Sequence, residues 1–128
     1  MGLFDRFNKR SLYYKGTEFK EQGELDKALE CFNKVLKMDN EYVNAWYRKG
    51  QVFAELERNE DALYCFEKVL ELNPDNVGGL IAKGVVLGNL KKYDEALMYF
   101  DRALKLDPKN MWGWFNKCVC LDVSGDIQ

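Results

Sequence analysis

A period of 34 residues runs through this chain and limits what it can fold into. Gly16, Gly50 and Gly84 are spaced by 34 residues and then by 34 again. Three further columns keep the same step, with Asn40 in place of a first proline: Ala28, Ala62 and Ala96; Phe32, Phe66 and Phe100; Pro74 and Pro108. Self-similarity at such a period is typical of proteins built from stacked repeats. We therefore expect three complete units and part of a fourth.

Within each unit, small and apolar residues recur at the spacing of a helix. Trp46, Gly50 and Phe53 fall at i, i+4 and i+7, which places them on one helix face. Ala62 begins a second set with the same spacing. Each unit therefore predicts two amphipathic helices of about 13 residues.

Turn-forming residues separate the expected helices. Gly23 divides the first pair, and residues 73–76 and 107–110 end the second helix of the next two units. Because asparagine is a favoured N-cap residue, Asn76 and Asn110 are expected to cap the helices that follow them. The whole pattern predicts an all-α chain of about seven helices.

The repeated residues together resemble the tetratricopeptide repeat. The columns that carry this resemblance are Trp46, Gly50, Phe53, Ala62, Phe66 and Pro74; Leu80, Gly84, Ala96, Phe100 and Pro108; and, more loosely, Leu12, Gly16, Phe19, Ala28 and Phe32. The resemblance implies a right-handed superhelical stack of antiparallel helix hairpins. Pentatricopeptide repeats, which bind RNA, fit less well, because they tend to a period of 35 and suit a basic chain.

The period also divides the chain. Repeats are expected at 9–42, 43–76 and 77–110. Residues 111–128 are then the first helix of a truncated fourth repeat or a capping helix, and residues 1–8 are an N-terminal extension or the start of the first helix.

A concave groove is the expected binding surface, because the first helices of successive hairpins line one in the family that this chain resembles. Each residue turns a helix by about 100°, so the position after each packing residue should face the groove. The predicted lining is Tyr13, Thr17, Asn44, Tyr47, Gln51, Gly78, Ile81, Val85, Gly88, Trp112, Phe115 and Val119. Its N-terminal half is mixed polar and its C-terminal half is nearly all apolar.

The apolar half predicts a trough for an amphipathic helix or an extended apolar segment. Gly78 and Gly88 would deepen the trough by lacking side chains. The alternative is that further repeats, or a C-terminal helix beyond this chain, cover it. Some relatives grip a C-terminal carboxylate with Lys, Asn and Arg, but the matching positions here are Tyr13, Thr17, Arg48, Gly78 and Ala82. Such a clamp is therefore not expected.

The sequence predicts a non-enzymatic protein-interaction module. It has no histidine, and no phosphate loop, nucleophile motif or metal-ligand spacing occurs in it. Two alternatives remain open. The chain can be the docking domain of a longer enzyme or regulator, or it can self-associate, with Leu3, Phe4 and Phe7 docking into the trough of a neighbour.

Composition restricts the partners further. A net charge of −2 and a pI near 5.3 argue against nucleic acid. No apolar run approaches the roughly 20 residues of a membrane helix, and no secretory signal begins the chain. We therefore expect a cytoplasmic protein that binds a protein or peptide and needs no metal or cofactor. The four cysteines are expected to be small buried thiols.

A lysine precedes each residue of the small column, where the family usually has leucine. The column is Lys15, Lys49, Lys83 and Lys117. These lysines are expected to cover apolar surface with their stems. The alternative is a cationic ladder for an acidic ligand.

Overall fold

The computed structural model describes residues 3–125, with side chains from residue 8 onward. This span contains seven helices and no strand: α1 (Leu3–Glu21), α2 (Leu25–Met38), α3 (Val43–Glu55), α4 (Asn59–Leu72), α5 (Val77–Asn89), α6 (Tyr93–Leu106) and α7 (Met111–Ser124). The prediction of an all-α chain of about seven helices is thus confirmed. Leu3, Phe4 and Phe7, which were considered for self-docking, have side chains outside the described residues.

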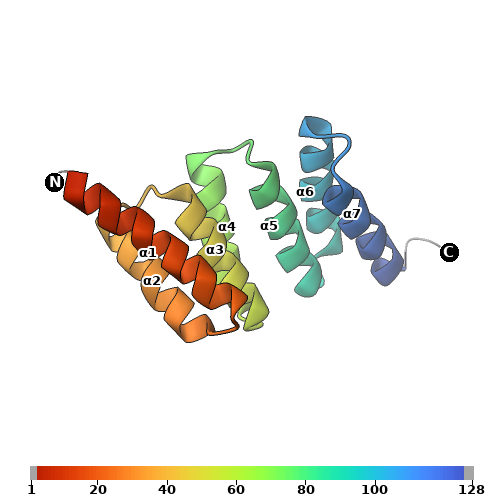
Figure 1. Ribbon diagram of the computed structural model, residues 1–128. Helices are drawn as coiled ribbons and strands as arrows, with labels where there is room; N and C mark the ends of the chain where they lie inside the picture. Colours follow the sequence, from red (N-terminus) through yellow and green to blue (C-terminus); the bar gives the residue numbers. More distant parts are fainter. Residues whose placement is uncertain (1–2, 126–128) are drawn as a thin grey trace.

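The helices form hairpins that stack in one direction along the chain (Figure 1). Each odd-numbered helix up to α5 packs most extensively on the even-numbered helix that follows it, and α3, α5 and α7 then pack on the hairpin before them. Helix α7 contacts α6 and α5, and no described helix follows it. The last first-helix of the stack is therefore without a hairpin partner within residues 3–125.

Close contact between the glycine and phenylalanine columns holds each hairpin together. A Cβ atom on Gly50 would lie 2.6 Å from Cε1 of Phe66, and one on Gly84 would lie 2.5 Å from Cε1 of Phe100. These rings are almost completely buried. Glycine therefore lets the two helices approach until the ring fills the space that a side chain would take.

The predicted caps are confirmed. The Oδ1 atom of Asn76 accepts a hydrogen bond from the N–H of Gly79 at 2.8 Å, and Asn110 does the same for Gly113 at 3.0 Å. Each bond satisfies one of the backbone donors that the first turn of a helix leaves without a partner in the helix.

A column of left-handed residues ends the first helices. Gly23 and Gly125 have φ of 79° and 81°, and the equivalent positions are Glu57 at 58° and Lys91 at 64°. Only glycine adopts this conformation without steric cost, so the second and third hairpins each hold a strained turn residue.

The lysine column covers aromatic surface, as the sequence predicts. The ammonium of Lys83 lies 4.4 Å from the ring centre of Tyr99 and 3.9 Å from a carboxylate oxygen of Glu67. The ammonium of Lys117 pairs with Asp101 at 2.7 Å. Both lysines therefore use their charge within the stack, which argues against a cationic ladder.

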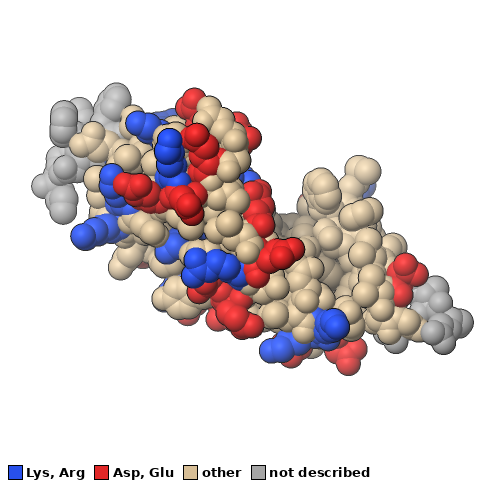
Figure 2. Space-filling model, turned by 90° about the horizontal axis from the view of Figure 1, so that it is seen from below, with Lys and Arg blue, Asp and Glu red and all other residues tan. Residues whose placement is uncertain are grey.

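Charge is unevenly distributed along the stack. On the face shown in Figure 2, charged side chains crowd the part nearer the N-terminus, whereas uncharged side chains cover most of the part nearer the C-terminus. On this face, the C-terminal end therefore offers the less polar surface.

Candidate functional site

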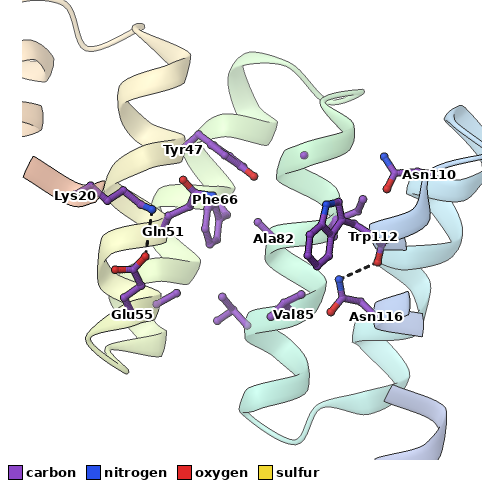
Figure 3. Close-up of a pocket in the computed structure, with 14 residues that line it drawn as sticks. Lys20, Tyr47, Gln51, Glu55, Phe66, Ala82, Val85, Asn110, Trp112 and Asn116 are labelled. Atoms are coloured by element: carbon purple, nitrogen blue, oxygen red, sulfur yellow. Dashed lines mark hydrogen bonds and ion pairs between the residues drawn. The ribbon is translucent and has the colours of Figure 1, made fainter. Parts of the chain in front are cut away.

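A hollow of about 600 Å³, here called the central hollow, lies between α3, α5 and α7 (Figure 3). Six of the predicted groove residues line it: Tyr47, Gln51, Gly78, Ile81, Val85 and Trp112. The hollow arises because the first helices are spread on this side while the second helices fill the other.

One wall of the central hollow is apolar. Ile81 and Val85 project from α5, and the Trp112 ring extends from α7 toward Val85 and Ala82 (Figure 3). Ile81 is nearly buried, whereas Trp112 leaves 70% of its surface exposed. The wall therefore combines a packed floor with a large exposed aromatic ring, which suits an apolar side chain of a ligand.

Polar side chains occupy the opposite rim and bond to one another. The ammonium of Lys20 lies 3.1 Å from Oε1 of Glu55 (Figure 3). Arg48 donates to Oε1 of Gln51 at 2.9 Å and, through Nε, to the hydroxyl oxygen of Tyr13 at 3.3 Å. These bonds within the protein reduce the charge that the rim offers to a ligand.

Gly78 makes room for Tyr47. A Cβ atom on Gly78 would lie 3.5 Å from both Cε1 and the hydroxyl oxygen of Tyr47. The tyrosine ring thus lies over the start of α5, and the space beside Gly78 is shared between the hollow and this ring.

A second, smaller hollow of about 140 Å³ lies beside the first, and we call it the side hollow. Gly88 and Val119, both predicted groove residues, line it. Val85 and Asn116 line both hollows, so the two adjoin one another around these residues. Around Gly88 the space is open, because a Cβ atom there would meet nothing within 4 Å. Together the two hollows form the groove.

Four predicted groove residues line neither hollow. Tyr13 is 8% exposed and belongs to the core, and the Thr17 hydroxyl donates to the Tyr13 carbonyl oxygen at 3.1 Å. Asn44 is exposed outside the hollows. Phe115 is 60% exposed and lies edge-on to Trp112, with ring centres 6.2 Å apart. The N-terminal part of the predicted lining is therefore largely outside the groove.

Sequence reasoning missed a column of groove residues. Ala82 and Asn116 line the central hollow, 34 residues apart, and Arg48 precedes them by the same step. Each stands two residues before the small column. The predicted lining was therefore one helical row too narrow, and this column would have supplied the missing row.

The cysteines show no metal chemistry. Within the described residues, no group of three or more Cys, Asp, Glu or His side chains is placed to hold a metal ion. Burial raises the pKa of the Cys65 thiol to about 11 and also raises that of Cys31. Cys120 is buried as well, but Cys118 is exposed. The prediction of buried thiols is therefore wrong for Cys118, because no described helix covers that side of α7.

The described residues include no helix that is both long and apolar enough to cross a membrane.

Comparison with known families gives two matches. The tetratricopeptide repeat profile matches residues 43–76 and 79–110, and a second TPR repeat profile matches residues 16–57. No curated protein matches the sequence.

Several solved structures share the fold. The first TPR of Spaghetti (RPAP3), bound to the HSP90 peptide SRMEEVD, is 20% identical with a TM-score of 0.87, over 92% of this chain and 94% of that chain. The Arabidopsis OM64 TPR domain is 19% identical with a TM-score of 0.88, over 93% and 98%. A tetratricopeptide repeat protein from Parabacteroides merdae is 23% identical with a TM-score of 0.85, over 92% of this chain and 46% of that chain. At these identities the likeness is one of fold.

Proposed function

This chain belongs to the tetratricopeptide repeat family, and from that premise we propose that it binds another polypeptide in the groove between α3, α5 and α7. The proposed ligand is an amphipathic helix or an extended apolar segment. Val85 is the central contact, since it lines both hollows. The family's fold is a protein-interaction module, which supports a binding role without catalysis.

The observation that carries the proposal is the apolar wall of the groove. Ile81, Val85 and Trp112 present aliphatic and aromatic surface beside open space of about 600 Å³. Hydrophobic grooves of this kind accept the apolar face of a helix through side chains at i, i+3 or i+4, and i+7. The rim charges are paired within the protein, so they contribute little attraction for a strongly charged ligand.

An acidic C-terminal tail suits this groove less well. One protein of similar fold is bound to the HSP90 peptide SRMEEVD. At the positions where some relatives grip a carboxylate, this chain has only one cationic residue, Arg48, and its guanidinium bonds to Tyr13 and Gln51. We therefore propose an apolar ligand in a cytoplasmic setting.

The alternative of a docking domain in a longer enzyme or regulator leaves the same groove as the contact surface. In that case the catalytic residues lie in another domain, and the groove still determines which protein is bound. The test of the groove below applies to both cases.

The test is a binding titration with Val85→Asp. A labelled 18-residue amphipathic helix with leucines on one face is the probe, and a peptide of equal composition with the leucines scattered is its control. Fluorescence anisotropy should show binding of the first peptide and at least a tenfold weaker Kd for Val85→Asp, because an unpaired carboxylate in an apolar contact costs more than about 1.4 kcal/mol.

Met98→Asp is the matched control, because Met98 is an exposed apolar residue on α6 outside both hollows. It should leave the Kd unchanged, and circular dichroism should show both variants folded. Equal affinity of Val85→Asp and the parent protein, or equal binding of both peptides, would contradict the proposal.

A further inference from the structure

Helix α7 leaves exposed the face that the other first helices bury within their own hairpins. Leu80 of α5 is fully buried, whereas Trp114, one repeat later, is 48% exposed. Gly84 is buried, whereas the equivalent Cys118 is exposed. This face of α7 is therefore shaped to pack against another helix.

We propose that the missing helix is α7 of a second copy of this chain. The two α7 helices pack antiparallel about a two-fold axis that passes near Cys118, which lies near the midpoint of Met111–Ser124. Such a pairing is isologous, because each copy offers the same surface to the other.

The exposed apolar area is adequate for a dimer. Six large apolar side chains of α7 are between 43% and 82% exposed: Met111, Trp112, Trp114, Phe115, Val119 and Val123. Taking about 200 Å² for a large side chain, they expose roughly 700 Å² per copy. Stable complexes bury about 800 Å² per partner, so this face approaches the size of a full interface.

Cys118 selects against an ordinary second helix. In the other hairpins a phenylalanine ring lies where a Cβ on the opposite glycine would be only 2.5–2.7 Å away. Cys118 carries that Cβ and a sulfur atom, so a helix with phenylalanine in the same register would collide with it. The partner helix must present a small residue there. In the antiparallel pair, Cys118 of the second copy is that residue.

Charge also favours the antiparallel pair. Lys117 is turned toward Asp101 at 2.7 Å and away from the interface. Asp122 lies near the C-terminal end of α7, so antiparallel packing places it beside the N-terminal half of the partner helix. The N-terminal end of a helix carries partial positive charge and attracts a carboxylate.

The opposite end of the stack does not offer an alternative apolar surface. The exposed residues of α1 include Asn8, Arg10, Ser11 and Lys15. Head-to-tail association would place these polar side chains on the apolar face of α7. A closed dimer through α7 avoids this mismatch.

The dimer does not depend on the groove ligand. Its centre is Cys118, whereas the groove is tested at Val85 on α5. Failure of Val85→Asp to weaken peptide binding would leave the dimer standing, and the converse also holds.

Sedimentation velocity from about 1 μM to about 500 μM tests the proposal. The parent chain should pass from monomer to dimer over this range. Cys118→Arg should stay monomeric at least tenfold beyond the parent's midpoint, because two like charges would meet at the axis. Met98→Arg should dimerise like the parent. A parent chain that is monomeric throughout, or a dimer that survives Cys118→Arg, would overturn the proposal.

Cross-linking with a short bis-maleimide gives a second readout. Cys31, Cys65 and Cys120 are buried, so the reagent should join Cys118 to Cys118 in the dimer. Cys118→Ala should still dimerise in the centrifuge but yield no cross-linked product. A dimer of the parent chain that gives no Cys118 cross-link would exclude the antiparallel arrangement about this residue.

Discussion

Gly84 and Phe100 are packed so closely that a Cβ atom on residue 84 would lie 2.5 Å from Cε1 of the ring. The ring has no exposed side toward which it could move, because it is 2% exposed. The same relationship joins Gly16 to Phe32, at 2.7 Å. The glycine column is thus a steric requirement of the hairpin.

Gly84→Ala should therefore destabilise the protein, although alanine is the better helix former. Overpacking of a buried contact costs about 1–3 kcal/mol, which exceeds the gain in helix propensity. Urea unfolding followed by circular dichroism should show a lower midpoint with an unchanged slope. An unchanged or higher midpoint would mean that the α5–α6 hairpin can separate at no cost.

Gly88→Ala, four residues later on the same helix, should have the opposite effect. A Cβ there meets nothing within 4 Å, so only the propensity term remains. Because Gly88 lies in the last turn of α5, we expect a gain of about 0.5 kcal/mol. The same urea titration measures it, and the pair Gly84→Ala and Gly88→Ala separates steric packing from propensity within one helix. A loss of stability would show that Gly88 is needed for another reason.

The sequence was sufficient to predict the helices and their pairing, because both depend on local and periodic signals. The glycine and phenylalanine columns meet in space as their equal spacing suggests. The lining of the groove was harder to predict, because it depends on how far neighbouring helices rotate. Tyr13 is drawn into the core by Arg48 and its aromatic neighbours, whereas Asn116 turns into the hollow. A single helical period does not encode these rotations.

Lys91→Gly should stabilise the protein. Lys91 has a φ of 64°, and the equivalent residue of the first hairpin is Gly23, at 79°. A non-glycine residue in the left-handed region costs about 1–2 kcal/mol, of which the greater flexibility of glycine in the unfolded chain offsets part. We expect a gain of about 0.5–1 kcal/mol in the unfolding free energy. Lys92→Gly removes the same charge at a φ of −93° and should give no gain. Equal effects of the two changes would attribute the result to charge.

Asn76→Ala should cost about 1 kcal/mol, because it removes the side-chain acceptor that caps the N–H of Gly79 at 2.8 Å. Asn76→Asp keeps the acceptor and adds negative charge at the start of α5, where the helix dipole favours it. It should therefore retain the parent's stability. Thermal unfolding of the three proteins checks the ranking, and a loss in Asn76→Asp equal to that in Asn76→Ala would show that the cap is not the stabilising contact.

The buried thiol of Cys65 should make stability fall as the pH rises. Burial raises its pKa from 9.0 to about 11 in the folded chain. Between these values the folded state holds a proton that the unfolded state has released, so the free energy of unfolding decreases with pH. Below pH 8 the thiol is protonated in both states and has no such effect.

Cys65→Ala removes this titration but leaves the lysines and tyrosines that ionise in the same range. The stability of the parent relative to Cys65→Ala should therefore shrink by about 1–2 kcal/mol between pH 7 and pH 10.5. Urea unfolding at the two pH values measures the difference. A constant difference would mean that the Cys65 thiol ionises equally in the folded and unfolded chains, and so that water reaches it in the packed α3–α4 hairpin.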